Sequence, residues 1–502
     1  MTMSERHKVI NTLGGLKESG WKSISVKEEI RRNLIRKIKA GEKLLPGIMG
    51  YDTSVLPQLQ HALLAKHDII LLGLRGQAKT RILRLMVNFL DEYIPVVKGS
   101  EINDDPLHPV SRQARDLIKE QGDETPITWL HRSQRYGEKL ATPDTTVADL
   151  IGDIDPIKAA TRKLTLADEN VINFGLVPRT NRGIFAINEL PDLQPRIQVA
   201  LLNIMQERDI QIRGFNVRIP LDVAMLFSAN PEDYTSRGNI ITPLKDRIDS
   251  QIMTHYPRDI GVGMAITEQE AWVARNGVVK VFIPDIIKEL IEQVAFEARE
   301  SEYIDQKSGV STRMTITAME QLISSAERRA LINDEPEATV RITDVYHTVP
   351  ALTGKLELVY EGEQEGAVNV AKHILGKAIK KTFAKHFPDP QRQKKQESED
   401  VYKPVLDWFA AGNELDLKDH ISQREYEKTL SRVDGLKKIA TDYGSKDLRK
   451  DPYVLMDLIL EGLHQNSMLG KEDLDDQRSY SDMLGSMLGS MGDLDDFDDF
   501  DR

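Results

Sequence analysis

A glycine-bounded run that ends in Lys-Thr holds the residue types that a triphosphate-binding loop requires. The run is GLRGQAKT, and its candidate binding residues are Gly73, Gly76, Gln77, Ala78, Lys79 and Thr80. Glycines let backbone N–H groups face phosphates, Lys79 can reach the outer phosphates, and the Thr80 hydroxyl can ligate Mg²⁺. Ala78 stands where the strict pattern G-x-x-x-x-G-K-[ST] has its last glycine. The alternative is an ordinary strand–helix turn with a surface lysine.

A second run, GIFAINE from Gly183 to Glu189, has the composition of a buried strand that ends in polar residues. In a triphosphate site such a strand delivers an acidic pair, one carboxylate for the Mg²⁺ shell and one to polarise the attacking water. Glu189 is available for the water, whereas Asn188 offers the metal shell only a neutral carbonyl oxygen. The alternative is a strand end with a solvated glutamate.

Two further polar residues follow where a nucleotide-hydrolysing site would use them. Asn230 comes directly after an apolar run, so its amide could position the water beside the γ-phosphate. Arg247 lies in the run PLKDRID and could stabilise transition-state charge from a neighbouring subunit. An arginine in an Asp-Arg pair is more often a salt-bridged surface residue.

The composition favours a multidomain protein of a reducing compartment. A chain of 502 residues with 40% hydrophobic residues predicts about two to four domains. The absence of cysteine excludes disulfides and thiolate metal sites, and no apolar run approaches the roughly 18 residues that span a bilayer. Met1 is followed by polar residues rather than a signal segment, so we expect a cytoplasmic location without a membrane span.

The net charge of −12 argues against nucleic acid as a partner. The histidines lack metal-ligand spacing, so no metal other than Mg²⁺ is expected.

Hydrophobic periodicity predicts the elements that would position these residues. A helix is expected over 56–65, a buried strand over 67–73 and a second helix over 80–90, which is the strand, glycine turn and helix order of a phosphate-binding loop. Further strands are expected at 184–187 and 223–228, with a helix over 196–206 and a hairpin over 209–219 that turns at Gly214. Strands that alternate with helices predict a doubly wound α/β core.

The chain resembles the AAA+ ATPases of the magnesium-chelatase I-subunit and MoxR clade. The order and spacing of five motifs carry this resemblance: the glycine loop, the second run, the hairpin, Asn230-Pro231 and the Leu244–Asp249 run. The resemblance covers about residues 46–390 and includes segments 147–155 and 201–208. Arg313, in the run Ser-Thr-Arg, resembles the sensor-2 arginine of these proteins, which contacts the γ-phosphate. The resemblance implies ATP and Mg²⁺ as cofactors, with Thr80 and Asn188 at the metal.

The expected architecture is an α/β P-loop AAA+ core with a parallel sheet between helices, an all-helical lid and an additional helical C-terminal region. We expect an N-terminal helical extension (1–45), the ATPase core (46–258), the lid (259–390), a linker with an accessory helical region (391–470) and an acidic disordered tail (471–502). In the extension, Ile30, Leu34 and Ile38 would share one helix face. The tail is expected because the segment from Lys471 is acidic and poor in branched apolar residues.

The resemblance implies a homo-oligomeric, hexameric ring with ATP between subunits, Arg247 acting across the interface and the Gly214 hairpin facing the pore or a partner. The favoured function is a MoxR-like ATPase that hydrolyses ATP slowly and remodels or activates protein partners, including a von Willebrand factor A-domain protein. The first alternative is a magnesium-chelatase I-type motor for tetrapyrrole metal insertion. The second is a nucleotide-gated assembly scaffold with little hydrolysis, which Asn188 keeps open. An enhancer-binding transcriptional activator is less favoured because the chain lacks a GAFTGA-like loop and a clear basic helix-turn-helix.

Overall fold

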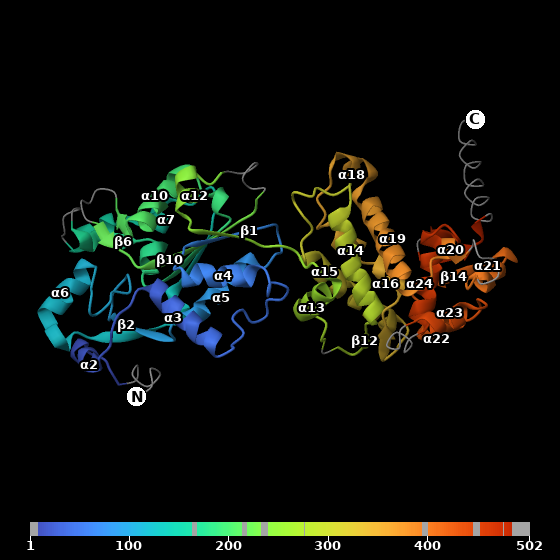
Figure 1. Ribbon diagram of the computed structural model, residues 1–502, viewed down its shortest axis with the longest axis horizontal. Helices are drawn as coiled ribbons and strands as arrows, with labels where there is room; N and C mark the ends of the chain where they lie inside the picture. Colours follow the sequence, from blue (N-terminus) through green and yellow to red (C-terminus); the bar gives the residue numbers. More distant parts are fainter. Residues whose placement is uncertain are drawn as a thin grey trace. The chain divides into compact units, whose positions relative to one another are not determined.

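The chain forms two compact units, Met1–His255 and Tyr256–Arg502, in the computed structural model (Figure 1). The structure describes residues 9–162, 168–212, 218–231, 239–275, 277–393, 400–444, 452–474 and 476–483. The boundary between the units lies close to position 258, where the sequence predicts the end of the ATPase core.

A five-stranded parallel sheet forms the centre of the first unit. Its strands, in spatial order, are β11 (Ser250–Met253), β1 (Ile69–Leu72), β10 (Val223–Ala229), β7 (Gly183–Asn188) and β4 (Tyr136–Leu140). The sequences IILL of β1 and GIFAIN of β7 are continuous apolar runs because both faces of these strands are buried. This sheet confirms the predicted α/β class and the predicted strands.

Alternate residues of the central strands contribute to two separate hydrophobic clusters. Ile70, Phe185 and Phe227 belong to one cluster, whereas their strand neighbours Leu71 and Ala186 belong to the other. Side chains along a strand point to opposite faces, so the sheet has a core on each side. One core includes residues of α3 (Val26–Lys39), α4 (Val55–Leu64) and α5 (Lys79–Leu85). The other includes residues of α7 (Val147–Leu150), α10 (Pro195–Gln206) and α12 (Thr242–Arg247).

Helix α3, which the sequence places in an N-terminal extension, is part of the first unit's core. Ile30 and Leu34 are buried with the residues of β1, but Ile38, in the last turn of the helix, is 44% exposed. Arg135 makes two hydrogen bonds to Glu29 of α3, Nη1–Oε1 at 2.8 Å and Nη2–Oε2 at 2.6 Å, and both side chains are buried. Residue 45 is therefore no structural division, because Val26, Ile30, Leu34, Leu44 and Leu45 belong to the same hydrophobic cluster as residues of the sheet.

Smaller elements complete the first unit. The predicted hairpin is present as the antiparallel pair β8 (Asp209–Gln211) and β9 (Arg218–Pro220), whereas its turn at Gly214 lies outside the described residues. The other antiparallel pairs are β2 (Tyr93–Val97) with β3 (Ile127–His131) and β5 (Gly152–Ile154) with β6 (Ile172–Phe174). The remaining α-helices among the described residues are α2 (Leu13–Glu18), α6 (Arg112–Gln121), α8 (Pro156–Arg162) and α9 (Leu176–Arg179).

The second unit is mainly helical, as predicted for the lid. Its first helices are α13 (Ile260–Glu270), α14 (Asp285–Glu300), α15 (Arg313–Ile332), α16 (Ile342–Tyr346), α17 (Val349–Thr353), α18 (Tyr360–Glu365) and α19 (Ala367–His386). A short parallel pair, β12 (Lys280–Phe282) with β13 (Glu337–Thr339), interrupts them. The part that follows contains α20 (Pro390–Gln393), α21 (Lys403–Ala410), α22 (Gln423–Leu430), α23 (Leu436–Tyr443) and α24 (Pro452–Gln465).

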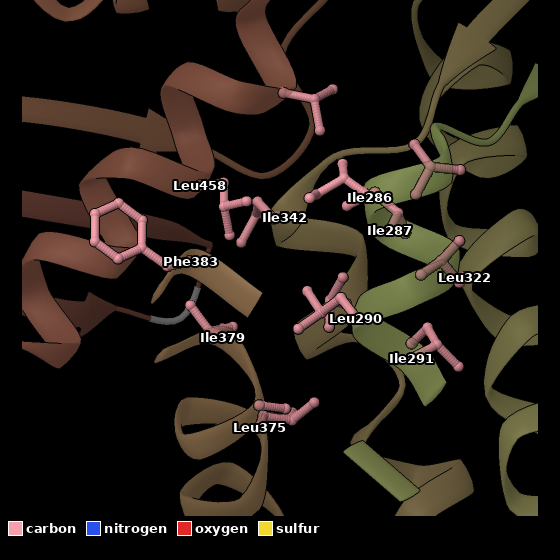
Figure 2. Packing of buried hydrophobic residues seen from close by; sticks show 14 of the residues in the cluster. Ile286, Ile287, Leu290, Ile291, Leu322, Ile342, Leu375, Ile379, Phe383 and Leu458 are labelled. Carbon is pink, nitrogen blue, oxygen red and sulfur yellow. The ribbon is translucent and has the colours of Figure 1, made fainter. Parts of the chain in front are cut away.

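The lid and the predicted accessory region share one hydrophobic cluster. Figure 2 shows Leu290 of α14, Ile379 of α19 and Leu458 of α24 among the residues of this cluster. Helix α19 contacts both α14 and α24 along its length, so it joins the two parts. Residues 400–444 and 452–470 therefore belong to the same compact unit as the lid.

The C-terminal segment from Lys471 corrects a second prediction. Residues Gly470–Leu474 form β15, which pairs with β16 (Gln477–Ser481), and β16 pairs in turn with β14 (Leu415–Lys418). Arg478 and Tyr480 of β16 are buried. The predicted tail thus cannot begin at 471. Its later part, 484–502, lies outside the described residues.

A buried ionic network explains why this polar segment is folded. Arg478 Nη1 lies 3.2 Å from Asp457 Oδ1 and 3.1 Å from Glu461 Oε1, and Lys471 Nζ lies 3.1 Å from the same Glu461 oxygen. The Tyr480 hydroxyl donates to Glu461 Oε1 at 2.7 Å. Two cations of the segment thus neutralise two acids of α24, which burial would otherwise disfavour.

Among the helices that the structure describes, none is long and apolar enough to cross a membrane.

Candidate functional site

The candidate residues of the first unit meet at the carboxyl edge of the parallel sheet. Strand β10 lies between β1 and β7, with Leu72 opposite Ala229 and Phe227 opposite Ile187. Gly73, Asn230 and Asn188 follow these strands, or end them, at one edge. The Gly73 N–H donates to the Ala229 carbonyl at 3.2 Å. The topology therefore brings together both runs and Asn230, and this edge is where open α/β sheets bind ligands.

The loop before α5 takes a conformation that favours glycine at two positions. Gly76 has a φ of 74°, and Ala78 has a φ of 58° with a ψ of 16°. The left-handed conformation brings the Cβ of an L-residue close to the following carbonyl oxygen and costs about 1–2 kcal/mol. This is the physical reason why the usual pattern has glycine at position 78, and Ala78 carries that strain.

Lys79 is buried at the start of α5 and bonds to its own loop. Its Nζ donates to the carbonyl oxygens of Gly73 and of Leu74, the latter at 3.0 Å. These carbonyl groups hold the ammonium group inside the curve of the loop. Phosphate oxygens bound at the start of the helix would compete with these carbonyl groups for the ammonium group.

Two residues that the sequence did not single out, Tyr51 and Thr254, fix the loop from outside. Thr254 Oγ1 donates to Gln77 Oε1 at 2.6 Å, and the Tyr51 hydroxyl donates to the Gln77 carbonyl at 2.9 Å. A Cβ on Gly73 would overlap both Thr254 Oγ1 and Gln77 Oε1. Only glycine fits at position 73, and Gln77 is held by side chains distant in sequence. No spacing rule connects these positions, so no sequence signal could have found them.

A cavity of about 300 Å³ lies beside Tyr51. Apolar side chains before and within α4 line much of it: Ile38, Leu44, Leu45, Ile48, Tyr51 and Leu56. Its size and apolar lining suit a flat ring system. Tyr51 joins this cavity to the phosphate-binding loop through its bond to Gln77.

Thr80 and Asn188 lie within hydrogen-bond distance, as a metal site between the two runs requires. Thr80 Oγ1 donates to Asn188 Oδ1 at 3.2 Å, and Ser228 Oγ donates to the same oxygen at 2.9 Å. Asn188 Nδ2 donates to Glu138 Oε1 at 2.9 Å. Glu138 was not predicted from the sequence. Its ion pair with Arg84 outweighs partial burial and lowers the pKa of Glu138 below its ordinary value.

Glu189 has an unusual backbone conformation at the end of β7. Its φ is 54° and its ψ is 51°, and its N–H donates to Ser228 Oγ at 3.4 Å. A non-glycine residue held in the left-handed region is a feature that clusters at functional sites. Asn230 is buried, and its Oδ1 accepts no hydrogen bond from the described residues. Both side chains flank the strand ends where a water could be held.

The two candidate arginines lie on different units. Arg247, at the end of α12, donates to Gln206 Oε1 at 2.9 Å and to the Pro243 carbonyl at 2.8 Å. These contacts tie it to α10 and to its own helix. Arg313 begins α15 in the second unit, where its side chain is exposed and its N–H donates to Ser311 Oγ at 3.2 Å. The roles of both arginines toward a nucleotide remain predictions.

The donor set fits a magnesium–nucleotide complex. A loop with two residues of positive φ and a buried lysine has the features of a phosphate-binding loop, and the hydroxyl of Thr80 is a hard oxygen donor of the kind that Mg²⁺ binds together with water and phosphate oxygens. Thr80 would bind the Mg²⁺ ion, and the Asn188 side-chain oxygen would contribute to the shell of groups around that ion.

Comparison with known protein families gives a match between residues 164–250 and the Sigma-54 interaction domain. This span contains β7, Asn230 and Arg247. A curated relative, the magnesium-chelatase 38 kDa subunit of Cereibacter sphaeroides, is 26% identical over 215 residues, which are 41% of this chain and 57% of that protein. The chain thus matches little more than half the length of this relative. Over part of its length the chain is therefore similar to AAA+ ATPases of the magnesium-chelatase type.

Solved structures also resemble parts of the chain. One is a putative ATPase from Cytophaga hutchinsonii, with 18% identity, a TM-score of 0.30, and coverage of 72% of this chain and 97% of that one. Another is a magnesium-chelatase BchI–BchD complex, with 18% identity, a TM-score of 0.34, and coverage of 64% and 98%. NtrX from Brucella abortus has 15% identity, a TM-score of 0.36, and coverage of 70% and 66%. Scores this low identify nothing on their own, and the sheet order and the site are the stronger observations.

Proposed function

We propose that this chain is a MoxR-like ATPase that binds Mg²⁺–ATP, hydrolyses it slowly and uses the cycle to remodel or activate protein partners. The observation that carries the proposal is the contact between Thr80 and Asn188, which joins the phosphate-binding loop to the strand that ends in Glu189. Asn230 directly follows β10, the strand that lies between β1 and β7.

Each side chain has a distinct task in this proposal. When bound, ATP supplies the transferable phosphoryl group, and Mg²⁺ supplies the positive charge that withdraws electron density from that group. Lys79 exchanges the carbonyl groups of its own loop for phosphate oxygens, and Thr80 donates its hydroxyl hydrogen bond to Asn188. Glu189 holds and orients the attacking water, and the Asn230 amide fixes that water from the other side. The apolar cavity beside Tyr51 accommodates the adenine ring.

Arginines would complete the site from elsewhere. Arg247 would act in trans on a neighbouring subunit of a ring, which we propose to be a hexamer, and Arg313 would contact the γ-phosphate. An arginine supplied in this way stabilises the charge of the transition state. We propose a von Willebrand factor A-domain protein as one partner of the ring.

Asn188 supports slow turnover rather than a loss of hydrolysis. A carboxylate at this position would hold the metal shell by charge, whereas the amide offers one neutral oxygen. Glu189 retains the carboxylate that the water requires.

A motor for magnesium insertion into tetrapyrroles is a second candidate. The match to a magnesium-chelatase subunit favours it. The residues after 400, which pack into the core of the second unit, are more than a minimal motor requires. The match to the Sigma-54 interaction domain does not lead us to propose transcriptional activation, because the sequence has no GAFTGA-like loop.

Phosphate release from Mg²⁺–ATP tests the proposal in the purified full chain, with Glu189→Gln and Lys79→Ala as controls. We expect slow release by the wild type, loss of release but retained ATP binding in Glu189→Gln, and loss of binding in Lys79→Ala. ATP binding without release above the Glu189→Gln level would instead favour the nucleotide-gated scaffold. Capture of partners by Glu189→Gln with ATP, compared with Lys79→Ala, then separates an A-domain protein from a tetrapyrrole enzyme as the client.

A further inference from the structure

The amide of Asn188 has one orientation, and Glu138 determines it. Asn188 Oδ1 accepts hydrogen bonds from Thr80 and Ser228, while its Nδ2 donates to Glu138 Oε1 at 2.9 Å. A half turn of the amide would place Oδ1 against a carboxylate oxygen, which can only accept. The charge on Glu138 therefore keeps the Asn188 oxygen directed toward Thr80.

Arg84 holds Glu138 in this position with two bonds. Its Nε donates to Glu138 Oε2 at 2.8 Å and its Nη2 to Oε1 at 2.9 Å. The Tyr136 hydroxyl donates to Oε2 at 3.2 Å. Planar two-bond pairing of this kind fixes the direction of a carboxylate as well as its place.

These contacts link side chains of α5, β7 and β4 in a closed ring that includes Thr80. Thr80 and Arg84 are separated by four residues in α5, so they lie on the same face of that helix. From Thr80 the ring passes to Asn188 on β7, then to Glu138 on β4, and returns to Arg84 on α5. The Asn188 amide thus links the Glu138 carboxylate to the Thr80 hydroxyl, which would bind Mg²⁺.

We propose that Glu138 is a positioning residue of the nucleotide site, which supplies from the neighbouring strand the negative charge that Asn188 lacks. This inference rests on the proposed binding of Mg²⁺–ATP. The Thr80 hydroxyl must donate its hydrogen to an acceptor when its oxygen faces a metal ion, and Asn188 Oδ1 is that acceptor. Glu138 keeps this oxygen in place and polarises the amide.

The test measures how Mg²⁺ changes the thermal unfolding of the full chain in the presence of ADP. In Glu138→Gln, we expect the Mg²⁺ concentration for the half-maximal shift to rise about 10–100-fold, as for other partners of metal-site residues. The shift caused by ADP without Mg²⁺ should equal that of the wild type. The matched control is Glu120→Gln, on the exposed face of α6, which removes the same charge and should keep the wild-type response.

A second variant separates charge from simple loss of structure. The double variant Asn188→Asp with Glu138→Gln exchanges carboxylate and amide between the two positions. The new carboxylate on β7 can accept from Thr80, while the new amide on β4 can donate to that carboxylate and accept from Arg84. We expect this double variant to recover the wild-type Mg²⁺ dependence.

Three results would overturn the proposal. In the first, Glu138→Gln reduces the thermal shift caused by ADP equally with and without Mg²⁺, and the double variant does not restore it. This result would mean that Glu138 only supports the fold. An unchanged Mg²⁺ dependence in Glu138→Gln would remove its role while leaving the proposed function intact. A wild type whose unfolding responds to neither ADP nor Mg²⁺–ADP would contradict the proposed function itself, and the role of Glu138 with it.

Discussion

Thr254 donates a hydrogen bond to Gln77 at 2.6 Å and so connects the end of β11 to the middle of the phosphate-binding loop. The Thr254 hydroxyl also lies 3.1 Å from the Leu72 carbonyl, at the end of β1. The loop is thus fixed to the neighbouring strand before any nucleotide is present. Such preorganisation lowers the ordering cost that binding must otherwise meet.

Replacement of Thr254 by Val should loosen the loop and weaken nucleotide binding. The change leaves the buried Gln77 oxygen without its donor, at a cost of about 1–3 kcal/mol. We expect a lower unfolding midpoint and a higher Kd for ADP, measured by thermal unfolding and calorimetry. Thr254→Ser keeps the hydroxyl and serves as the control. A Val variant that binds ADP as tightly as the Ser variant would contradict this role.

Replacement of Ala78 by Gly should stabilise the first unit. The residue has a φ of 58°, and relief of this strain should contribute about 1 kcal/mol. For a unit of this size, that corresponds to a rise in Tm of about 2–4 °C. The measurement is thermal unfolding without nucleotide. Ala114→Gly, in a buried part of α6, is the comparison because glycine should lower Tm there. An equal fall in both variants would show that position 78 is not strained.

The sequence identified those parts of the site that depend on local order along the chain. Gly73 to Thr80 and Gly183 to Glu189 could be recognised because a strand, a turn and a helix follow each other directly. Thr254 and Glu138 could not, because their importance comes from strand pairing: Glu138 is brought beside Asn188 only by the register of β4 with β7. Composition was misleading for the segment after Lys471, because its polar residues are buried as ion pairs with α24.

Replacement of Arg135 by Met should strongly destabilise the first unit. Arg135 pairs with the buried Glu29 and donates to the Arg182 carbonyl at 2.9 Å through its Nε. Loss of one partner of a buried pair leaves an uncompensated charge and costs about 3–5 kcal/mol. Urea unfolding of the full chain measures the change. The double variant Arg135→Met with Glu29→Leu should lose less stability than Arg135→Met alone, because neither charge of the pair then stays buried. A greater or equal loss in the double variant would contradict this explanation.

The second unit should lose stability in acid because of Glu461. Burial alone would raise the pKa of Glu461, but Lys471 and Arg478 outweigh it and lower this pKa to about 2, from an ordinary value of 4.5. A carboxyl whose pKa is lower in the folded state contributes its full stability above the unfolded value. That contribution decreases as the pH falls from about 4.5 toward about 2, and its total is about 3 kcal/mol.

The measurement is the unfolding free energy of the second unit in the full chain between pH 6 and pH 2.5, compared with that of Glu461→Gln. Other carboxyl groups also titrate in this range, so the difference between the two proteins isolates Glu461. The wild type should be the more stable protein near pH 6, because the substitution leaves Lys471 and Arg478 with one acid fewer. This advantage should shrink steadily below pH 4.5. A difference that stays constant with pH would show that Glu461 keeps the same protonation state in the folded and unfolded chains, and that the ion pairs do not hold the segment after Lys471 by charge.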